Sequence, residues 1–132
     1  MRTDKLIRVL SKCVAPLVAG AIWALSSQST LPEIKGVFGV DKVQHLLAYA
    51  VLAVGVAFWF PRARWRERAT LTFVAVACIT SIYGATDEVH QHFVPGRSCD
   101  VWDWVADTAG AALGAALYTK ILKLYFKSST LN

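Results

Sequence analysis

Four long apolar segments dominate this sequence and constrain its fold more than any other feature. They cover roughly residues 6–27, 41–60, 69–91 and 101–124, and short polar segments separate them. A membrane-spanning helix needs about 20 predominantly apolar residues, and each segment approaches or exceeds that length. The chain is 55% hydrophobic and 17% charged, whereas an average soluble domain is about 25% charged. The sequence therefore predicts an all-α bundle of four transmembrane helices.

A soluble helical bundle is the alternative to this fold. It would have to hide four nearly continuous apolar helices in 132 residues, which is more apolar surface than a core of that size covers. The length suits one domain, so we expect residues 1–132 to form a single membrane domain. The first segment has a basic start, an apolar run and then small residues. It also has the features of a secretory signal peptide, so cleavage remains an alternative.

Basic residues predict how the helices are oriented. Four spans put both termini and the short basic loop 62–68 on one side of the membrane. That side holds eleven of the fourteen Lys and Arg residues, four before residue 13, four in the loop and three after residue 119. The positive-inside rule then predicts that both termini are cytoplasmic. These basic residues would face anionic membrane lipid. The net charge of +5 therefore indicates membrane lipid as a partner, and no nucleic acid is needed to explain it.

Polar side chains concentrate at the opposite, outer ends of the last three segments. The i, i+4, i+8 spacing puts Asp41, His45 and Tyr49 on one stripe, and Asp103 and Asp107 share another. Ionisable side chains in membrane helices turn toward partners or water, so we expect the stripes to face each other. The sequence thus predicts an outward polar binding pocket formed by Asp41, Lys42, His45, Tyr49, Asp87, Glu88, Gln91, Arg97, Asp103 and Asp107.

The residue types in this predicted pocket suit two kinds of chemistry. Imidazole and carboxylate groups bind zinc or manganese, so a divalent metal is a candidate cofactor. Alternatively, a His–Asp pair acts as a general base while Arg97 holds a phosphate. The run 87–92 differs from the zinc motif His-Glu-x-x-His, so its spacing specifies no ligand set. The candidate metal ligands are His45, Glu88, His90 and Asp103, and the candidate catalytic residues are His45, Asp87, Glu88, His90 and Arg97.

Several of these residues also have structural interpretations. Asp41 could be the N-cap of its helix, and Tyr49 could belong to an interfacial aromatic belt. Asp87 and Glu88 could form an ion-pair network with Arg97 that locks a loop to the bundle.

Other signals concern helix ends and packing. Asp100 is the expected N-cap of the last helix, and Pro16 is a potential kink in the first. Gly110 and Gly114 form a Gly-xxx-Gly pattern, which lets another helix backbone approach closely.

Three motifs in this order resemble the VanZ-like family of bacterial membrane proteins. They are Asp41-Lys42-x-x-His45-x-x-x-Tyr49, Asp87-Glu88-x-x-Gln91-x-Phe93-x-Pro95-Gly96-Arg97 and Asp103-x-x-x-Asp107-x-x-Gly110. The resemblance extends roughly from Ser27 to Gly114, and Asp107 stands where many members have Asn. It implies a small multi-pass protein of the bacterial cytoplasmic (inner) membrane. It also implies a cell-envelope role, such as resistance to the glycopeptide teicoplanin.

Three functions are compatible with the sequence. The first is binding of a polar or anionic envelope component, which is a lipid head group, a lipid-linked precursor or a glycopeptide. The second is a membrane-embedded hydrolase or transferase that acts on a lipid-linked phosphate or ester, with or without a metal. The third is a structural membrane subunit in which the polar stripes hold the helices together. The residues alone leave catalysis and the oligomeric state open.

Overall fold

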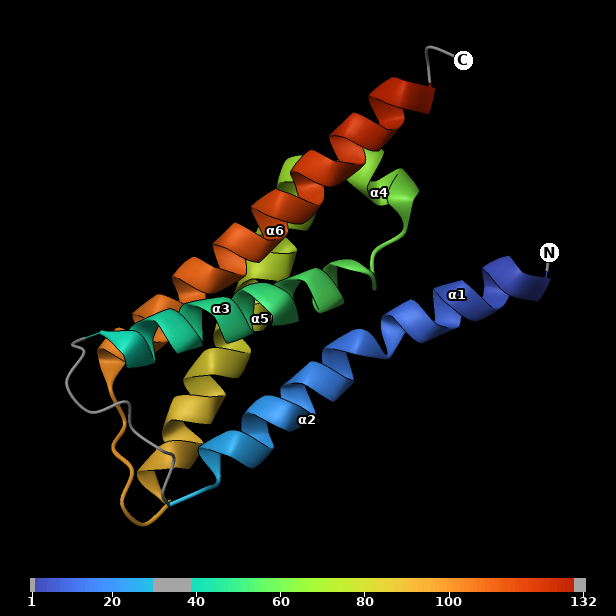
Figure 1. Cartoon of the computed structure of the whole chain (residues 1–132). Coiled ribbons are helices and arrows are strands. Elements are labelled where there is room, and N and C mark those ends of the chain that lie inside the picture. The colour runs from blue at the N-terminus through green and yellow to red at the C-terminus, as the bar shows by residue number, and fades with distance from the viewer. Residues whose placement is uncertain (1, 30–38, 130–132) are drawn as a thin grey trace.

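The computed structural model describes residues 2–29 and 39–129, and every regular element in these ranges is a helix. This confirms the predicted all-α class. The loop expected around residues 30–38 lies outside the described residues. The helices are α1 (Arg2–Lys12), α2 (Val14–Ser26), α3 (Val40–Ala57), α4 (Arg62–Glu67), α5 (Ala69–His92) and α6 (Val101–Ser129), as Figure 1 shows.

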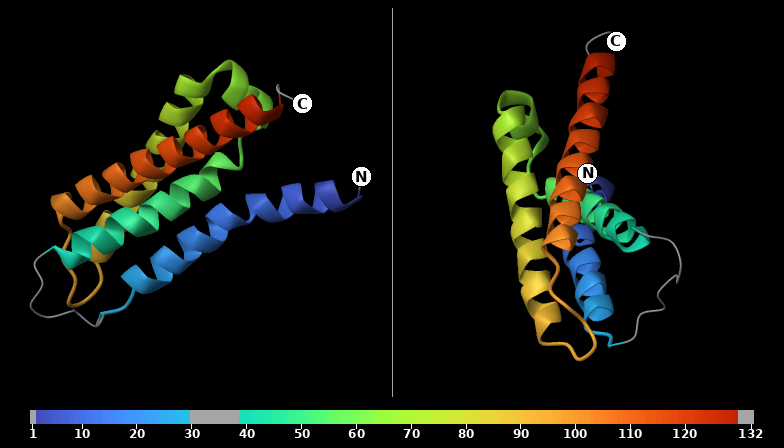
Figure 2. Two further views of the ribbon diagram at one scale, coloured as in Figure 1. Left: turned by 45° about the horizontal axis from the view of Figure 1, so that its top comes forward. Right: turned by 90° about the vertical axis from the view of Figure 1, so that its left-hand side faces the viewer.

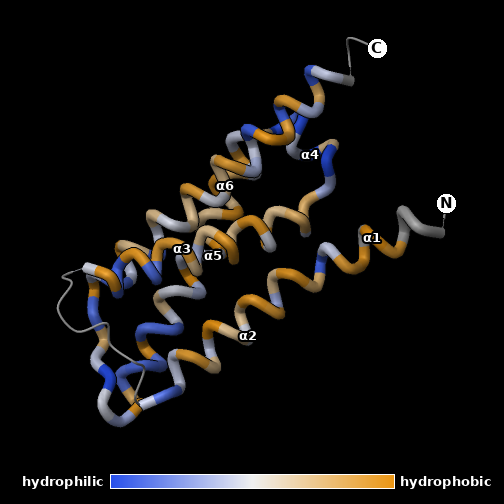
Figure 3. Tube along the Cα trace, viewed as in Figure 1, coloured by the Kyte–Doolittle hydropathy of each residue, from blue (hydrophilic) through white to orange (hydrophobic). Residues whose placement is uncertain are grey.

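Three helical stretches in the described part of the chain are long and apolar enough to cross a membrane. They are Val9–Ser26, Val40–Ala57 and Ala69–His92. The longest helix, α6, is not among them, so the predicted fourth span is not confirmed. Asp103, Asp107 and Lys120 lower the apolar character of α6. Figure 3 shows that hydrophilic residues gather where α5 and α6 are joined and again around α4, whereas α2 is largely hydrophobic.

The first apolar segment, predicted as a helix over roughly residues 6–27 with a potential kink at Pro16, is divided between α1 and α2. The break between α1 and α2 falls at Cys13. Pro16 explains it, because proline has no N–H and its ring crowds the carbonyl four residues earlier, that of Lys12. The Lys12 carbonyl oxygen instead accepts a hydrogen bond from Nε1 of Trp59, at 3.0 Å. The break therefore provides a contact between α1 and the segment that follows α3.

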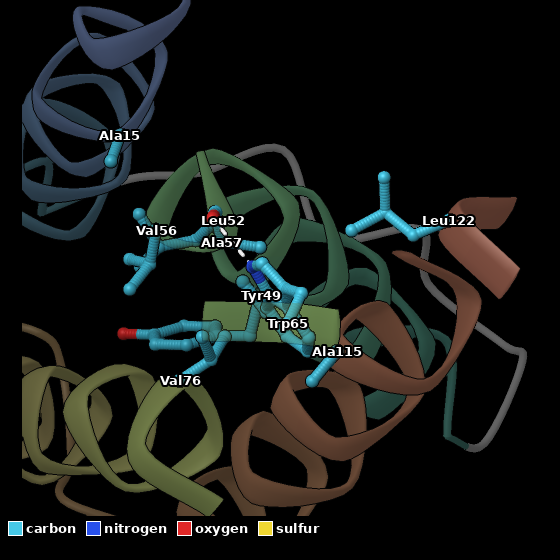
Figure 4. Packing of buried hydrophobic residues seen from close by; sticks show 10 residues of the cluster. Ala15, Tyr49, Leu52, Val56, Ala57, Trp65, Val76, Ala115 and Leu122 are labelled. Atoms are coloured by element: carbon cyan, nitrogen blue, oxygen red, sulfur yellow. Dashed lines mark hydrogen bonds between the residues drawn. The ribbon is translucent and has the colours of Figure 1, made fainter. Parts of the chain in front are cut away.

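The basic segment 62–68 was expected to be a loop, but most of it forms the short helix α4. Pro61 precedes the helix with an extended backbone, which suits a helix start. The Trp65 side chain is only 3% exposed, and its ring packs against Tyr118 of α6 with centroids 5.2 Å apart. Its Nε1 donates a hydrogen bond to the Ala57 carbonyl at 3.3 Å, drawn in Figure 4. Burial of this large side chain anchors the turn.

The most extensive contact in the bundle is between α3 and α6, followed by that between α5 and α6. Two glycines bring α3 and α6 together. A Cβ at Gly110 would collide with the backbone of Leu46, and one at Gly114 would collide with that of Ala50. The predicted close-packing role of both glycines is confirmed. Because Asp107 lies one turn before Gly110, the same approach presses it against α3.

The helices run up and down, and their ends sort into two groups. Figures 1 and 2 show the start of α1, the end of α6 and α4 toward one end of the molecule. The start of α3, the end of α5 and the start of α6 lie at the opposite end, called here the polar end. All three segments that carry the predicted pocket residues therefore converge there.

Candidate functional site

Lys42, in the first turn of α3, joins this helix to the start of α6. Its Nζ lies 2.6 Å from Oδ2 of Asp100 and 2.5 Å from Oδ1 of Asp103. It also lies 3.1 Å from Oδ2 of Asp41. These four residues are called the Lys42 cluster. Its members are partly exposed, and the hydrogen bond from Lys42 lowers the pKa of the Asp100 carboxyl below its usual range.

The next turn of α3 carries a buried pair. Nδ1 of His45 lies 2.8 Å from Oδ1 of Asp107, and the Asp107 side chain is fully buried. When Asp107 is ionised, Nδ1 is the donor of this hydrogen bond, because a carboxylate can only accept. The other oxygen of Asp107, Oδ2, has no hydrogen-bond partner within the described ranges. The pair therefore leaves one buried acceptor unused.

Glu88 and Tyr49 complete this buried group. One ligand-type atom from each of His45, Glu88 and Asp107 lies within 4.8 Å of the others. Tyr49, one turn beyond His45, is 1% exposed, and no hydrogen bond to its hydroxyl is formed by the described residues. The His45 and Tyr49 rings are nearly parallel, with centroids 6.5 Å apart. His45, Tyr49, Glu88 and Asp107 are called the His45 cluster.

Both carboxylate oxygens of Glu88 are oriented by neighbouring donors. Oε2 accepts a hydrogen bond from the backbone N–H of Asp100 at 2.9 Å. Oε1 accepts one from Nε2 of Gln91 at 3.3 Å. The residue that caps α6 thus fixes Glu88 beside the His45–Asp107 pair.

A third polar group, called the Asp87 network, joins α2, α5 and the loop after α5. Ser26 Oγ donates to Oδ1 of Asp87 at 2.5 Å, and Gln91 Nε2 donates to Oδ2 at 3.1 Å. Arg97 then donates to Oε1 of Gln91 at 2.8 Å. Arg97 forms no ion pair with a carboxylate in the described part of the chain. These hydrogen bonds form a network, but Arg97 joins it through the Gln91 amide and not through the ion pair that the sequence suggested.

The candidate metal ligands separate into different surroundings. His45 and Glu88 lie together, and Asp107 joins them. Asp103 belongs to the Lys42 cluster. His90 faces α2, where its ring stacks on Trp23 at 3.9 Å and its Nε2 lies 2.9 Å from Oγ of Ser27.

Two structural interpretations of single residues are wrong, and one is confirmed. Asp41 is not the N-cap of α3, because Gly39 holds that position with a φ of 85°. Tyr49 is buried in the bundle, so it is not part of an interfacial belt. Asp100 does cap α6, since its Oδ1 accepts the N–H of Trp102 at 2.8 Å.

Sequence reasoning missed two residues that shape the site. A Cβ at Gly84 would lie 2.9 Å from Oδ2 of Asp107 and 3.1 Å from Cε1 of Tyr49. Gly84 therefore makes the room in which the His45 cluster fits. Its position four residues before Glu88 on α5 was the available signal. Ser26, the partner of Asp87, carries no comparable signal because it comes from a distant helix.

An apolar hollow of about 90 Å³ lies between α2, α3 and α5. Its lining includes Ala15, Leu52, Ile79 and Tyr83, and no charged residue contributes to it. It is therefore separate from the three polar groups.

The comparison with protein families agrees with the motif resemblance. The VanZ/LLP1 family model matches residues 8–124, a region that contains all three polar groups. Comparisons with curated proteins and with solved structures return no significant match. Since the family model covers most of the chain, this protein belongs to the VanZ/LLP1 family.

Proposed function

We propose that this protein is a multi-pass protein of the bacterial cytoplasmic membrane, with four spans and both termini in the cytoplasm. Three apolar helices, the 29-residue length of α6 and the family support a membrane location. The basic α4, the start of α1 and the end of α6 lie at the end of the bundle away from the polar end (Figure 2). In this orientation the polar end faces outward.

The proposed role is binding of a polar envelope component at this outward end. The buried His45 cluster is the observation that carries the proposal. A buried polar atom without a partner costs about 1–3 kcal/mol, and among the described residues the cluster holds two such atoms, on Asp107 and Tyr49. Arrangements that lower stability are expected mainly at functional sites.

The polar groups indicate which part of a ligand would be bound. Lys42 already contacts three carboxylates, and Arg97 contacts an amide oxygen. The remaining acceptors, among them Oδ2 of Asp107, suit hydrogen-bond donors rather than anions. A lipid head group, a lipid-linked precursor or a glycopeptide such as teicoplanin offers hydroxyl or amine donors. The site is therefore proposed to bind such donors near the outer leaflet.

Gene deletion with complementation tests the envelope role. We expect the deletion strain to become more sensitive to teicoplanin or detergent, and the wild-type gene to restore survival. Glu88→Gln should restore less survival per unit of folded protein in the membrane. Glu67→Gln is the matched control, because Glu67 is exposed on α4. An unchanged deletion strain in every condition would overturn the envelope role.

Cysteine labelling tests the topology. Cys13, Cys78 and Cys99 are all exposed thiols, and Cys99 lies in the loop between α5 and α6. A chain that keeps only Cys99 should react with a membrane-impermeant maleimide in intact cells. A chain whose single cysteine replaces Arg66 of α4 should react only after lysis. The reverse pattern would invert the proposed orientation.

A membrane-embedded hydrolase or transferase is the second candidate, and the His45–Asp107 pair is the observation that favours it. A carboxylate that orients an imidazole is a common arrangement for a general base. Purified protein should then release product from a lipid-linked phosphate or ester, and His45→Gln should abolish turnover while the protein stays folded. If no product forms from any candidate lipid, binding remains the better explanation.

A further inference from the structure

The His45 cluster brings two carboxylates together in a buried place. Asp107 is fully buried and Glu88 is 3% exposed. Burying ionised carboxylates is costly unless cations or hydrogen bonds compensate them. Glu88 has donors on both oxygens, but Asp107 has His45 on one oxygen only. The cluster therefore carries more acceptor capacity than the described residues use.

Lys42 and Arg97 do not supply the positive charge that would compensate these two carboxylates. Lys42 Nζ is surrounded by three other carboxylates at 2.5–3.1 Å. The Arg97 guanidinium hydrogen-bonds Gln91. Neither cation contacts Glu88 or Asp107 in the described ranges, so within these ranges a proton or an added cation is what could compensate the two carboxylates.

We propose that His45, Glu88 and Asp107 bind one divalent cation of the zinc or manganese type. Three donors of one nitrogen and two oxygens lie within 4.8 Å of one another. Donors that share such an ion at about 2.0–2.2 Å from each lie about 3–4.5 Å apart, so only small side-chain movements are needed. The unpartnered, fully buried Oδ2 of Asp107 points independently to a ligand. One imidazole and two carboxylates suit zinc and manganese better than magnesium, which prefers oxygen ligands and water.

The surroundings of the cluster are built as metal sites usually are. The Asp100 N–H and the Gln91 amide orient Glu88 from outside the donor set. Such outer contacts fix ligand orientation and raise affinity. Gly84 leaves the space beside Asp107 Oδ2 that a side chain would fill. The ion would lie within the site proposed above, so its biological purpose rests on the proposed function, but its binding does not.

Titration of purified, metal-free protein tests the ion site. We expect about one equivalent of Zn²⁺ or Mn²⁺ per chain by calorimetry, and much weaker binding of Mg²⁺. His45→Gln, Glu88→Gln and Asp107→Asn should each weaken binding about tenfold or more. His92→Gln and Glu67→Gln are exposed matched controls and should bind as the wild type does. Stoichiometric binding that none of the three variants weakens would overturn the proposal.

A measurement on the wild-type protein guards against variants that fail to fold. Co²⁺ bound in a low-symmetry site of one nitrogen and two oxygens should give visible absorption bands that are much more intense than those of the aqueous ion. Zn²⁺ should then abolish them by displacement. Absence of these bands, or of any bound ion, would mean that protons neutralise the cluster. Survival in the complementation assay would be unaffected by that outcome, so the ion site and the envelope role fail separately.

Discussion

Asp103 and Asp107 lie one turn apart on the same face of α6, yet they belong to two contrasting regions. Asp103 pairs with Lys42 at 2.5 Å, and its side chain is 14% exposed. Asp107 pairs with His45 at 2.8 Å, is fully buried and leaves one oxygen unpartnered among the described residues. In the Lys42 cluster, a strong cation contacts every acid. In the His45 cluster, the imidazole pairs with Asp107, and Glu88 lies beside this pair without contacting a cation among the described residues.

This difference indicates a structural role for the Lys42 cluster and a functional role for the His45 cluster. The Lys42 cluster joins the starts of α3 and α6 with groups that are already paired, so it needs no ligand. Exposed ion pairs of this kind contribute little to stability, because water and salt screen them. In the His45 cluster, buried atoms have no partner among the described residues, which lowers stability unless a ligand or ion binds. The second region is therefore the better candidate for function.

The largest effect should come from Gly110→Ala, which breaks both regions at once. The new Cβ would collide with the Leu46 backbone and separate α6 from α3. Overpacking of this kind costs about 1–3 kcal/mol or more. Chemical unfolding in detergent should measure this loss. Gly20→Ala is the control, because Gly20 has open space around it and alanine favours a helix. Equal stability of Gly110→Ala and wild type would show that the close contact is not essential.

Two tyrosine substitutions sharpen the contrast between paired and unpaired groups. The Tyr83 hydroxyl donates to the Ala19 carbonyl at 2.7 Å, so Tyr83→Phe should cost about 0.5–1.5 kcal/mol of unfolding free energy. The Tyr49 hydroxyl has no such bond among the described residues. Tyr49→Phe should therefore leave stability unchanged or raise it in metal-free protein. The same unfolding assay compares them, and a larger loss for Tyr49→Phe would contradict the assignment of an unpaired hydroxyl.

The smallest effect should be the pH dependence of the Lys42 cluster. The hydrogen bond from Lys42 lowers the pKa of Asp100 in the folded protein. Its stabilising contribution is therefore present above the ordinary pKa of about 3.9 and is lost as the pH falls through the lowered value. Lys42→Gln should flatten this part of the curve of unfolding free energy against pH. High salt should also weaken the wild-type dependence. Parallel curves for both proteins would exclude this coupling.

Much of the fold followed from the sequence because its signals are local or periodic. Apolar runs predicted the positions of α3, α5 and α6 closely, and Asp100 marked the start of α6. The i, i+4 spacings placed His45 on one helix face and Asp107 on another, and these two faces were expected to meet. The interruption at Cys13 depends on Pro16, which signalled a kink but not its position. Whether Arg62–Glu67 would form a helix or a loop depended on the distant Tyr118, which a local pattern does not contain.

The site was harder to predict because partners come from different helices. The ten residues predicted to form one pocket belong to three networks, and the sequence could not divide them in this way. Asp103 and His90 have the right chemistry for a metal and nevertheless engage Lys42 and Trp23. Gly84 carries no chemistry of its own, and its role appears only when α5 packs against α3 and α6.

The central claim is that function resides in the His45 cluster and not in the Lys42 cluster. Its most direct test compares His45→Gln with Lys42→Gln in the deletion strain, as survival in teicoplanin or detergent per unit of folded protein in the membrane. We expect abundant His45→Gln protein that restores little survival, whereas Lys42→Gln should restore survival in proportion to its abundance. Full survival with His45→Gln, or abundant but inactive Lys42→Gln, would contradict it.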